Sequence, residues 1–230
     1  MTPWHAALCS LLLAASPQPP VAFDPGDPSS EVIGRASDQA LAGRTDWLGL
    51  YERDGGWRLE RTAVEIRPGD LQDLPSYRVL AEPGGPRLLL SAVPGLRPGP
   101  ATVAGDAVLL SQQTPSAGFT VGGRRYVVTL RSRQPNYCDA VVTVESGGVR
   151  QTLYEPATAG RSADPQLTLS CDEPHFEVKW AGDLDRDQRL DLLVTFSPKY
   201  SYHPQRLWLS SAAAPGALVG SVSLYELMAA

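Results

Sequence analysis

Pairs of glycines separate short runs of β-branched and aromatic residues along much of this chain. Glycine adopts the positive φ angles of tight hairpin turns, and β-branched and aromatic side chains favour strands. The pairs and their flanking runs are Asp54-Gly55-Gly56 between Trp47–Arg53 and Trp57–Ile66, Pro83-Gly84-Gly85-Pro86 between Tyr77–Ala81 and Arg87–Ser91, Gly122-Gly123 between Phe119–Val121 and Tyr126–Arg131, and Ser146-Gly147-Gly148 between Ala140–Glu145 and Val149–Tyr154. The pattern predicts an all-β fold with many short hairpins.

Further strand-like runs continue to the end of the chain: Gln166–Ser170, Phe176–Ala181, Leu190–Phe196, Arg206–Ser210 and Leu218–Tyr225. Their spacing is compatible with an antiparallel sandwich, a barrel or a meander. No internal repeat of blade length is present, which argues against a propeller. A chain of 230 residues with 43% hydrophobic and 20% charged residues can bury a substantial core. We expect a single all-β domain over residues 47–230.

The amino-terminal residues 1–22 have the composition of a signal peptide, because they contain no Asp, Glu, Lys or Arg. The apolar run Ala6–Ala15 has the length of a signal-peptide core and is too short to span a bilayer. Cleavage is expected after Ser16 or after Ala22. The alternative is a buried amino-terminal helix, which the prolines that follow would end. We predict export to the periplasm or the medium, with no transmembrane segment in the mature chain.

Residues 23–46 are expected to form a leader or linker, since Phe23–Ser30 is rich in Pro and Asp. Glu31–Leu41 can form a short helix behind a Ser30 cap. The mature chain keeps two cysteines, Cys138 and Cys171, and such a pair in an oxidising compartment predicts one disulfide. The alternative is two buried free thiols.

The segment from Asp183 to Asp191 carries the most specific chemical signal. Carboxylates occupy loop positions one, three, five and nine, at Asp183, Asp185, Asp187 and Asp191. Calcium takes six to eight oxygen ligands, and alternation places the first three side chains on the inside of a curved loop. The carbonyl group of Arg189 would supply a further ligand, and Asp191 would close the site. The alternative is a solvated acidic turn that binds nothing.

An EF-hand does not fit, because its twelfth position requires Glu and this loop has Val194 there. Over residues 180–194 the sequence resembles the FG-GAP/VCBS-type calcium repeat, whose core reads D-x-D-x-D-G-x-x-D before a hydrophobic strand. The resemblance implies a Ca²⁺ ion of structural role, bound by Asp183, Asp185, Asp187 and Asp191 and by the backbone of Arg189. Gln188 replaces the glycine of the pattern. The motif occurs once, so the adhesive and lectin-like roles of tandem repeats are not implied.

Several functional classes lack support in this sequence. The net charge is -5, so the chain lacks the excess of positive charge that is typical of nucleic-acid-binding proteins. The sequence contains no His-x-x-x-His or Cys-x-x-Cys pair for zinc, no Gly-x-Ser-x-Gly elbow, and no nucleotide-binding glycine loop. The leading expectation is therefore a non-enzymatic envelope or secreted binding protein with a glycan or protein ligand.

Three other side-chain groups leave alternatives open. Asp172, Glu173 and His175 follow Cys171 and would serve an exported hydrolase acting on glycan or peptide, although a polar turn is the simpler interpretation. The arginines 124, 125, 131 and 133 would suit an anionic glycan or phospholipid, or form a solvated strand face. The group Tyr200, Tyr202, His203 and Trp208 would stack on sugars if exposed, but core packing is favoured.

Overall fold

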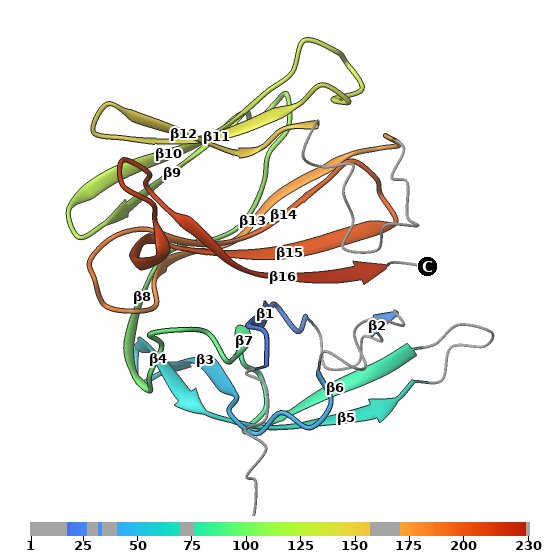
Figure 1. Cartoon of the computed structure of the whole chain (residues 1–230), viewed down its shortest axis with the longest axis vertical. Helices are drawn as coiled ribbons and strands as arrows, with labels where there is room; N and C mark the ends of the chain where they lie inside the picture. The colour runs from blue at the N-terminus through green and yellow to red at the C-terminus, as the bar shows by residue number, and fades with distance from the viewer. Residues whose placement is uncertain (1–17, 27–31, 34–40, 70–75, 157–170, 229–230) are drawn as a thin grey trace, which may run out of the picture.

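The computed structural model describes residues 18–26, 32–33, 41–69, 76–156 and 171–228, and it confirms the all-β prediction. The regular elements of these residues are strands and one short 3-10 helix, η1 (Ser210–Ala212). The strands form two antiparallel sheets (Figure 1).

The larger sheet has 12 strands in the order β1-β7-β3-β4-β8-β13-β14-β15-β16-β2-β6-β5. Its strands are β1 (Val21–Phe23), β2 (Val32–Ile33), β3 (Leu48–Arg53), β4 (Gly56–Arg61), β5 (Ala63–Pro68), β6 (Ser76–Glu82), β7 (Leu88–Ser91), β8 (Gly99–Leu109), β13 (His175–Asp183), β14 (Asp191–Ser197), β15 (Tyr202–Leu209) and β16 (Gly220–Met228). From β1 to β16 the sheet curls until β1 contacts β15 and β16. There the rings of Phe23 and Tyr225 lie 4.7 Å apart, so this part of the sheet is a nearly closed barrel.

The smaller sheet is a meander of four strands: β9 (Ser116–Val121), β10 (Arg124–Arg131), β11 (Val141–Ser146) and β12 (Val149–Tyr154). The glycines of both its hairpin turns, Gly122-Gly123 and Gly147-Gly148, have positive φ, as the sequence predicts. The strands β6 and β7, however, do not form a hairpin across Gly84-Gly85. Strand β6 pairs with β5 and β2, whereas β7 pairs with β1 and β3.

The two sheets pack face to face, and the outer face of β13–β14 supports the four-stranded sheet (Figure 1). Strand β14 is buried at every position. Leu192 and Val194 face the four-stranded sheet, and Leu193 faces the interior of the barrel. This two-sided burial explains why β14 is a continuous apolar run and does not alternate.

The folded unit begins before residue 47. Val21, Ala22 and Phe23 are only 3%, 1% and 1% exposed, although the sequence places them at the end of the signal peptide and the start of the leader. Arg44 is buried as well and donates a hydrogen bond to Ser91 Oγ. The helix expected over Glu31–Leu41 lies mostly outside the described residues, and Val32–Ile33 within it form strand β2.

Cys138 and Cys171 lie at disulfide distance, with Cα atoms 5.7 Å apart. Cys138 is in the turn between β10 and β11, and Cys171 precedes β13, so the pair joins the two sheets. Within the described residues, no helix has both the length and the apolar character needed to cross a bilayer.

Candidate metal centre

The acidic loop is the connection of the β13–β14 hairpin. Strand β13 ends at Asp183, β14 begins at Asp191, and the last paired residues are Gly182 and Asp191. The loop therefore connects two neighbouring paired strands, which correspond to the strand-like runs Phe176–Ala181 and Leu190–Phe196 expected from the sequence.

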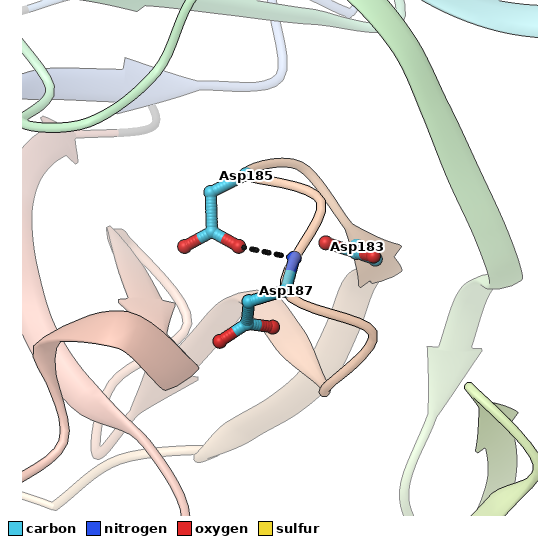
Figure 2. A group of neighbouring side chains, drawn as sticks. All are labelled: Asp183, Asp185 and Asp187. Carbon is cyan, nitrogen blue, oxygen red and sulfur yellow. Dashed lines mark hydrogen bonds between the residues drawn. The ribbon is translucent and has the colours of Figure 1, made fainter.

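Three of the predicted ligands converge within this loop (Figure 2). One carboxylate oxygen each from Asp183, Asp185 and Asp187 lies within 4.8 Å of the others. Two oxygens on opposite sides of one calcium ion are about 4.6–5.2 Å apart, because each Ca–O distance is about 2.3–2.6 Å. A single ion can therefore touch all three side chains.

Hydrogen bonds within the loop set its curvature. Asp183 accepts one from the amide of Arg186 (2.7 Å) and one from the amide of Gln188 (3.0 Å). Asp185 accepts a longer one from the amide of Asp187 (3.3 Å), drawn in Figure 2. Because each carboxylate binds an amide further along the chain, the loop turns inward around the three side chains.

Gln188 has a φ angle of 62°, in the left-handed region that favours glycine. This is the position at which the FG-GAP/VCBS pattern has glycine. The backbone thus adopts the conformation that the pattern requires, although the side chain present makes it less favourable.

Asp191 lies outside the cluster of three. It is 0% exposed, and its two oxygens accept hydrogen bonds from the amides of Leu184 (2.8 Å) and Ser210 (2.9 Å). Burial, together with the charge of Asp185, raises the pKa of Asp191 to about 8. These hydrogen bonds connect the base of the β13–β14 hairpin to η1 through Asp191.

Burial also raises the pKa of Asp183, and the charges of Asp185 and Asp187 add to that effect. Asp187 differs, because hydrogen bonds from Ser210 and Arg189 lower its pKa against the opposing effect of burial. Crowded carboxylates of this kind are stabilised by a bound cation.

Two serines that the sequence did not point to donate hydrogen bonds to the carboxylates of the loop. Ser210 Oγ donates to Asp187 (2.7 Å), and Ser211 Oγ donates to Asp185. Both come from η1, which follows β15 and has no sequence pattern linking it to the loop. The side chain of Arg189 bonds Asp187 Oδ2 (2.9 Å) and the carbonyl oxygen of Ser210 (3.0 Å).

The structure does not assemble the acid–base group considered from the sequence. Asp172 and Glu173 are exposed on the turn after Cys171. No hydrogen bond or ion pair links either of them to His175 in the described part of the chain. His175 instead contacts Glu177, with Nε2 3.2 Å from Oε2.

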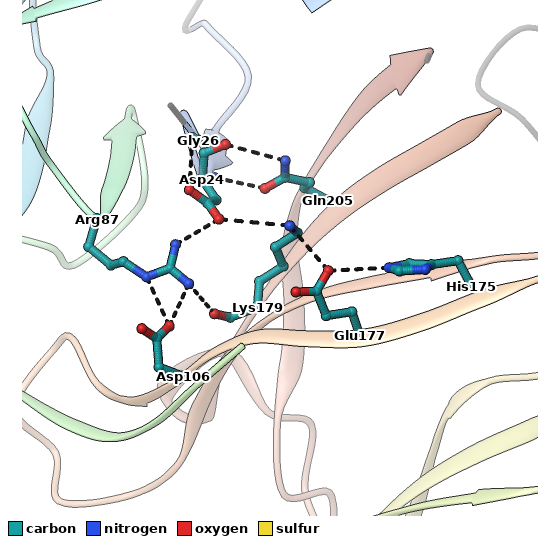
Figure 3. A network of polar contacts seen from close by, with 8 residues as sticks. All are labelled: Asp24, Gly26, Arg87, Asp106, His175, Glu177, Lys179 and Gln205. Carbon is teal, nitrogen blue, oxygen red and sulfur yellow. Dashed lines mark hydrogen bonds and ion pairs between the residues drawn. The ribbon is translucent and has the colours of Figure 1, made fainter. Parts of the chain in front are cut away.

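Glu177 belongs to a charged network that joins the amino-terminal segment to the barrel (Figure 3). Lys179 Nζ lies 3.1 Å from Glu177 and 3.8 Å from Asp24. Arg87 pairs with Asp24 (2.6 Å) and with Asp106 (2.5 Å). Each charged group in this network has an oppositely charged neighbour. The network therefore connects the segment after β1 to β8 and β13.

All four arginines of the basic group are exposed. Arg125 and Arg131 share one face of β10, Arg124 lies over the ring of Tyr126, and Arg133 pairs with Asp139. Among the aromatic residues, Tyr202 is 5% exposed, His203 and Trp208 are half-buried, and Tyr200 is 52% exposed. Core packing thus accounts for most of that group.

Comparison of the chain with protein-family models, curated proteins and solved structures finds no match.

Proposed function

We propose that this chain is an exported calcium-binding protein in which the ion stabilises the β13–β14 hairpin, and that it acts as a non-enzymatic envelope or secreted binding module. The observation that carries the proposal is the convergence of Asp183, Asp185 and Asp187 within the span of one ion. All three offer hard oxygen ligands, which calcium prefers over softer nitrogen or sulfur. The FG-GAP/VCBS resemblance supports the same assignment.

A structural role for the ion is supported by what the loop touches. Arg186 NH1 lies 3.5 Å from the carbonyl oxygen of Pro98, just before β8. A Cβ atom on Gly122, in the β9–β10 turn, would lie 2.2 Å from the carbonyl oxygen of Gln188. With the bonds to Ser210, the loop contacts both sheets and η1. An ion that fixed the loop would therefore stabilise the whole molecule.

Thermal unfolding with calcium or with a chelator tests this proposal. At a calcium concentration about 100 times Kd, binding adds about 2.7 kcal/mol, which raises the Tm of a chain of this size by about 5–10 °C. Asp185→Asn should abolish the rise in Tm, because it removes the negative charge of one ligand. The substitution should disturb the loop itself little, since the hydrogen bond from the amide of Asp187 to Asp185 is longer than either of the two that Asp183 accepts. Asp54→Asn, in an exposed turn, is the matched control and should keep it. Equal Tm values for the unmodified protein with calcium and with chelator would refute calcium binding.

A further inference from the structure

His175 and His203 come together in the fold, although no spacing motif links them in the sequence. His175 is the first residue of β13, and His203 is the second residue of β15. Strand β14 pairs antiparallel with both, so β13 and β15 run parallel and the two histidines lie at the same end of the sheet. Their imidazole rings meet edge to face, with the ring centres 5.6 Å apart and an angle of 76° between the planes.

The two rings reach toward each other across the end of β14. Adjacent strands lie about 4.8 Å apart, so the backbones of β13 and β15 are about 9–10 Å apart. The ring centres are much closer than this. The β14 residue that pairs with His175 is Ser197, whose small side chain bonds to the backbone of Lys199. A small residue at this position lets the imidazoles approach each other.

The separation of the rings is that of two imidazoles bound to one metal ion. Such rings have their centres about 5–6 Å apart, because each nitrogen binds an ion such as zinc at about 2.0–2.1 Å and the rings diverge from the ion. The observed 5.6 Å lies within this range. The χ2 torsion of histidine is broad, so each ring can turn one nitrogen toward a common point without a movement of the backbone.

Glu177 fixes the ring of His175 in a way that suits a metal ligand. Its Oε2 lies 3.2 Å from Nε2 of His175, a contact drawn in Figure 3. When Nε2 donates to this carboxylate, Nδ1 carries the lone pair, and no hydrogen bond to Nδ1 occurs in the described part of the chain. A carboxylate that accepts the N–H of an imidazole is a usual partner of metal-bound histidine, because it fixes the ring and strengthens its basicity.

The surrounding charges also favour a cation. Lys179 is a cation near the pair, but its Nζ lies 3.1 Å from Glu177 and 3.8 Å from Asp24, so two carboxylates face it. Apart from His175, the charged network of Figure 3 contains three carboxylates and two cations, which gives it a net charge of about −1. The side chain of His175 is 31% exposed, so an ion can reach it from solvent.

We propose that His175 and His203 bind a divalent transition-metal ion, with Glu177 as the positioning residue of His175 and water in the remaining coordination positions. Imidazole nitrogen suits Zn²⁺, Cu²⁺ and Ni²⁺, whereas Ca²⁺ and Mg²⁺ prefer oxygen ligands. The site therefore differs from the acidic loop in its ligand chemistry. It also lies at the opposite end of β13, which begins at His175 and ends at Asp183.

Titration calorimetry of the full chain with Zn²⁺ tests the proposal, with calcium in excess throughout. One Zn²⁺ should bind with a Kd in the micromolar range, and Mg²⁺ should not replace it. His175→Gln and His203→Gln should each weaken binding about tenfold or more, because each removes one of the two protein ligands. Glu177→Gln should weaken it about tenfold, as the loss of a partner of a metal-bound histidine does. Glu145→Gln makes the same change on β11 of the smaller sheet and is the matched control.

Electron paramagnetic resonance of the Cu²⁺-loaded protein identifies the ligands independently of affinity. The spectrum should show coupling to two imidazole nitrogens in the unmodified protein and in Glu177→Gln, and the coupling to one of them should be lost in His175→Gln. A purely structural role of Glu177 would not lower Zn²⁺ affinity while both nitrogens remain bound. His175 is partly exposed at the start of β13, so its variant should fold even if His203→Gln does not.

The proposal is overturned if the unmodified protein binds no Zn²⁺, or if His175→Gln binds Zn²⁺ as tightly as the unmodified protein does. Asp185→Asn should bind Zn²⁺ normally. Loss of zinc binding in that variant would place the ion in the acidic loop and would also overturn the inference. The calcium proposal is tested by the rise in Tm with calcium, so either idea can fail while the other stands.

Discussion

At the scale of single residues, Gln188 is one of several non-glycine residues whose backbone has a positive φ angle. Its φ of 62° costs a non-glycine residue about 1–2 kcal/mol. Gln188→Gly should therefore stabilise the protein by about 0.5–1 kcal/mol after the larger chain entropy of glycine is subtracted. Urea unfolding measures the change. Gln112→Gly, in an exposed loop without positive φ, is the control and should not stabilise the protein.

Glu177 makes a second residue-scale prediction, on pH dependence. The hydrogen bond from His175, aided by the charge of Lys179, lowers the pKa of Glu177 to about 2 despite its partial burial. A depressed carboxyl pKa contributes stability above the unfolded value of about 4.3, and that contribution is lost as the pH falls toward 2. Glu177→Gln should lower Tm at pH 7, and its difference from the unmodified protein should shrink between pH 4.5 and about 2. A difference that stayed constant across this range would contradict the assignment, and Glu173→Gln is the exposed control.

At the scale of elements, β1 bears on the proposed export of the chain and on where its signal peptide would be cleaved. Val21 and Ala22 are buried and pair with Ser91 and Leu90 of β7. Cleavage after Ala22 would remove both, and the burial of the valine alone contributes about 1.5–3 kcal/mol. Of the two cleavage positions that the sequence allows, the fold therefore favours the one after Ser16. Intact-mass measurement of the exported protein should find Val21 retained, and a mature chain that begins at Phe23 would contradict this.

The elements also show what could be predicted from sequence. The β9–β10 and β11–β12 hairpins have local signals in their glycine turns, and both were predicted. Strand β8 was missed, because its residues Gly99–Leu109 include glycines and a proline and it gains its strand form from pairing with β4 and β13. Strand β7 pairs with β1 and β3, and β6 pairs with β2 as well as with the preceding β5. The pairings with β1, β2 and β3 join segments that are distant in the chain, so no turn signal could have identified them.

The same limit applies to the candidate site. The spacing of Asp183, Asp185 and Asp187 was enough to place three carboxylates together, because alternation on a short loop is a local property. The role of Asp191 depends on η1, which follows the two strands β14 and β15 and whose Ser210 amide donates a hydrogen bond to Asp191. Contacts that arise from tertiary packing do not produce a regular spacing of residues in the sequence. The serines of η1 could therefore be found only in the structure.

At the scale of the whole molecule, Cys138 and Cys171 connect the four-stranded sheet to the start of β13. A disulfide across their sequence separation of 33 residues contributes about 3–4 kcal/mol in the chain-entropy model. The acidic loop and the cysteine pair belong to opposite ends of strand β13, since Asp183 ends the strand and Cys171 precedes it. Two attachments so placed would hold one sheet against the other along the full length of their contact.

This arrangement predicts that Cys138→Ser and Cys171→Ser each lower stability by about 3–4 kcal/mol, and that the double variant is no worse than either. Urea unfolding of the three variants measures the effect, with the reduced unmodified protein as the control. Mass mapping without reductant should find the two cysteines linked, whereas two alkylatable thiols in the native protein would contradict the bond. Calcium should still raise the Tm of the double variant, because its ligands lie at the other end of the strand and the contributions of distant sites add.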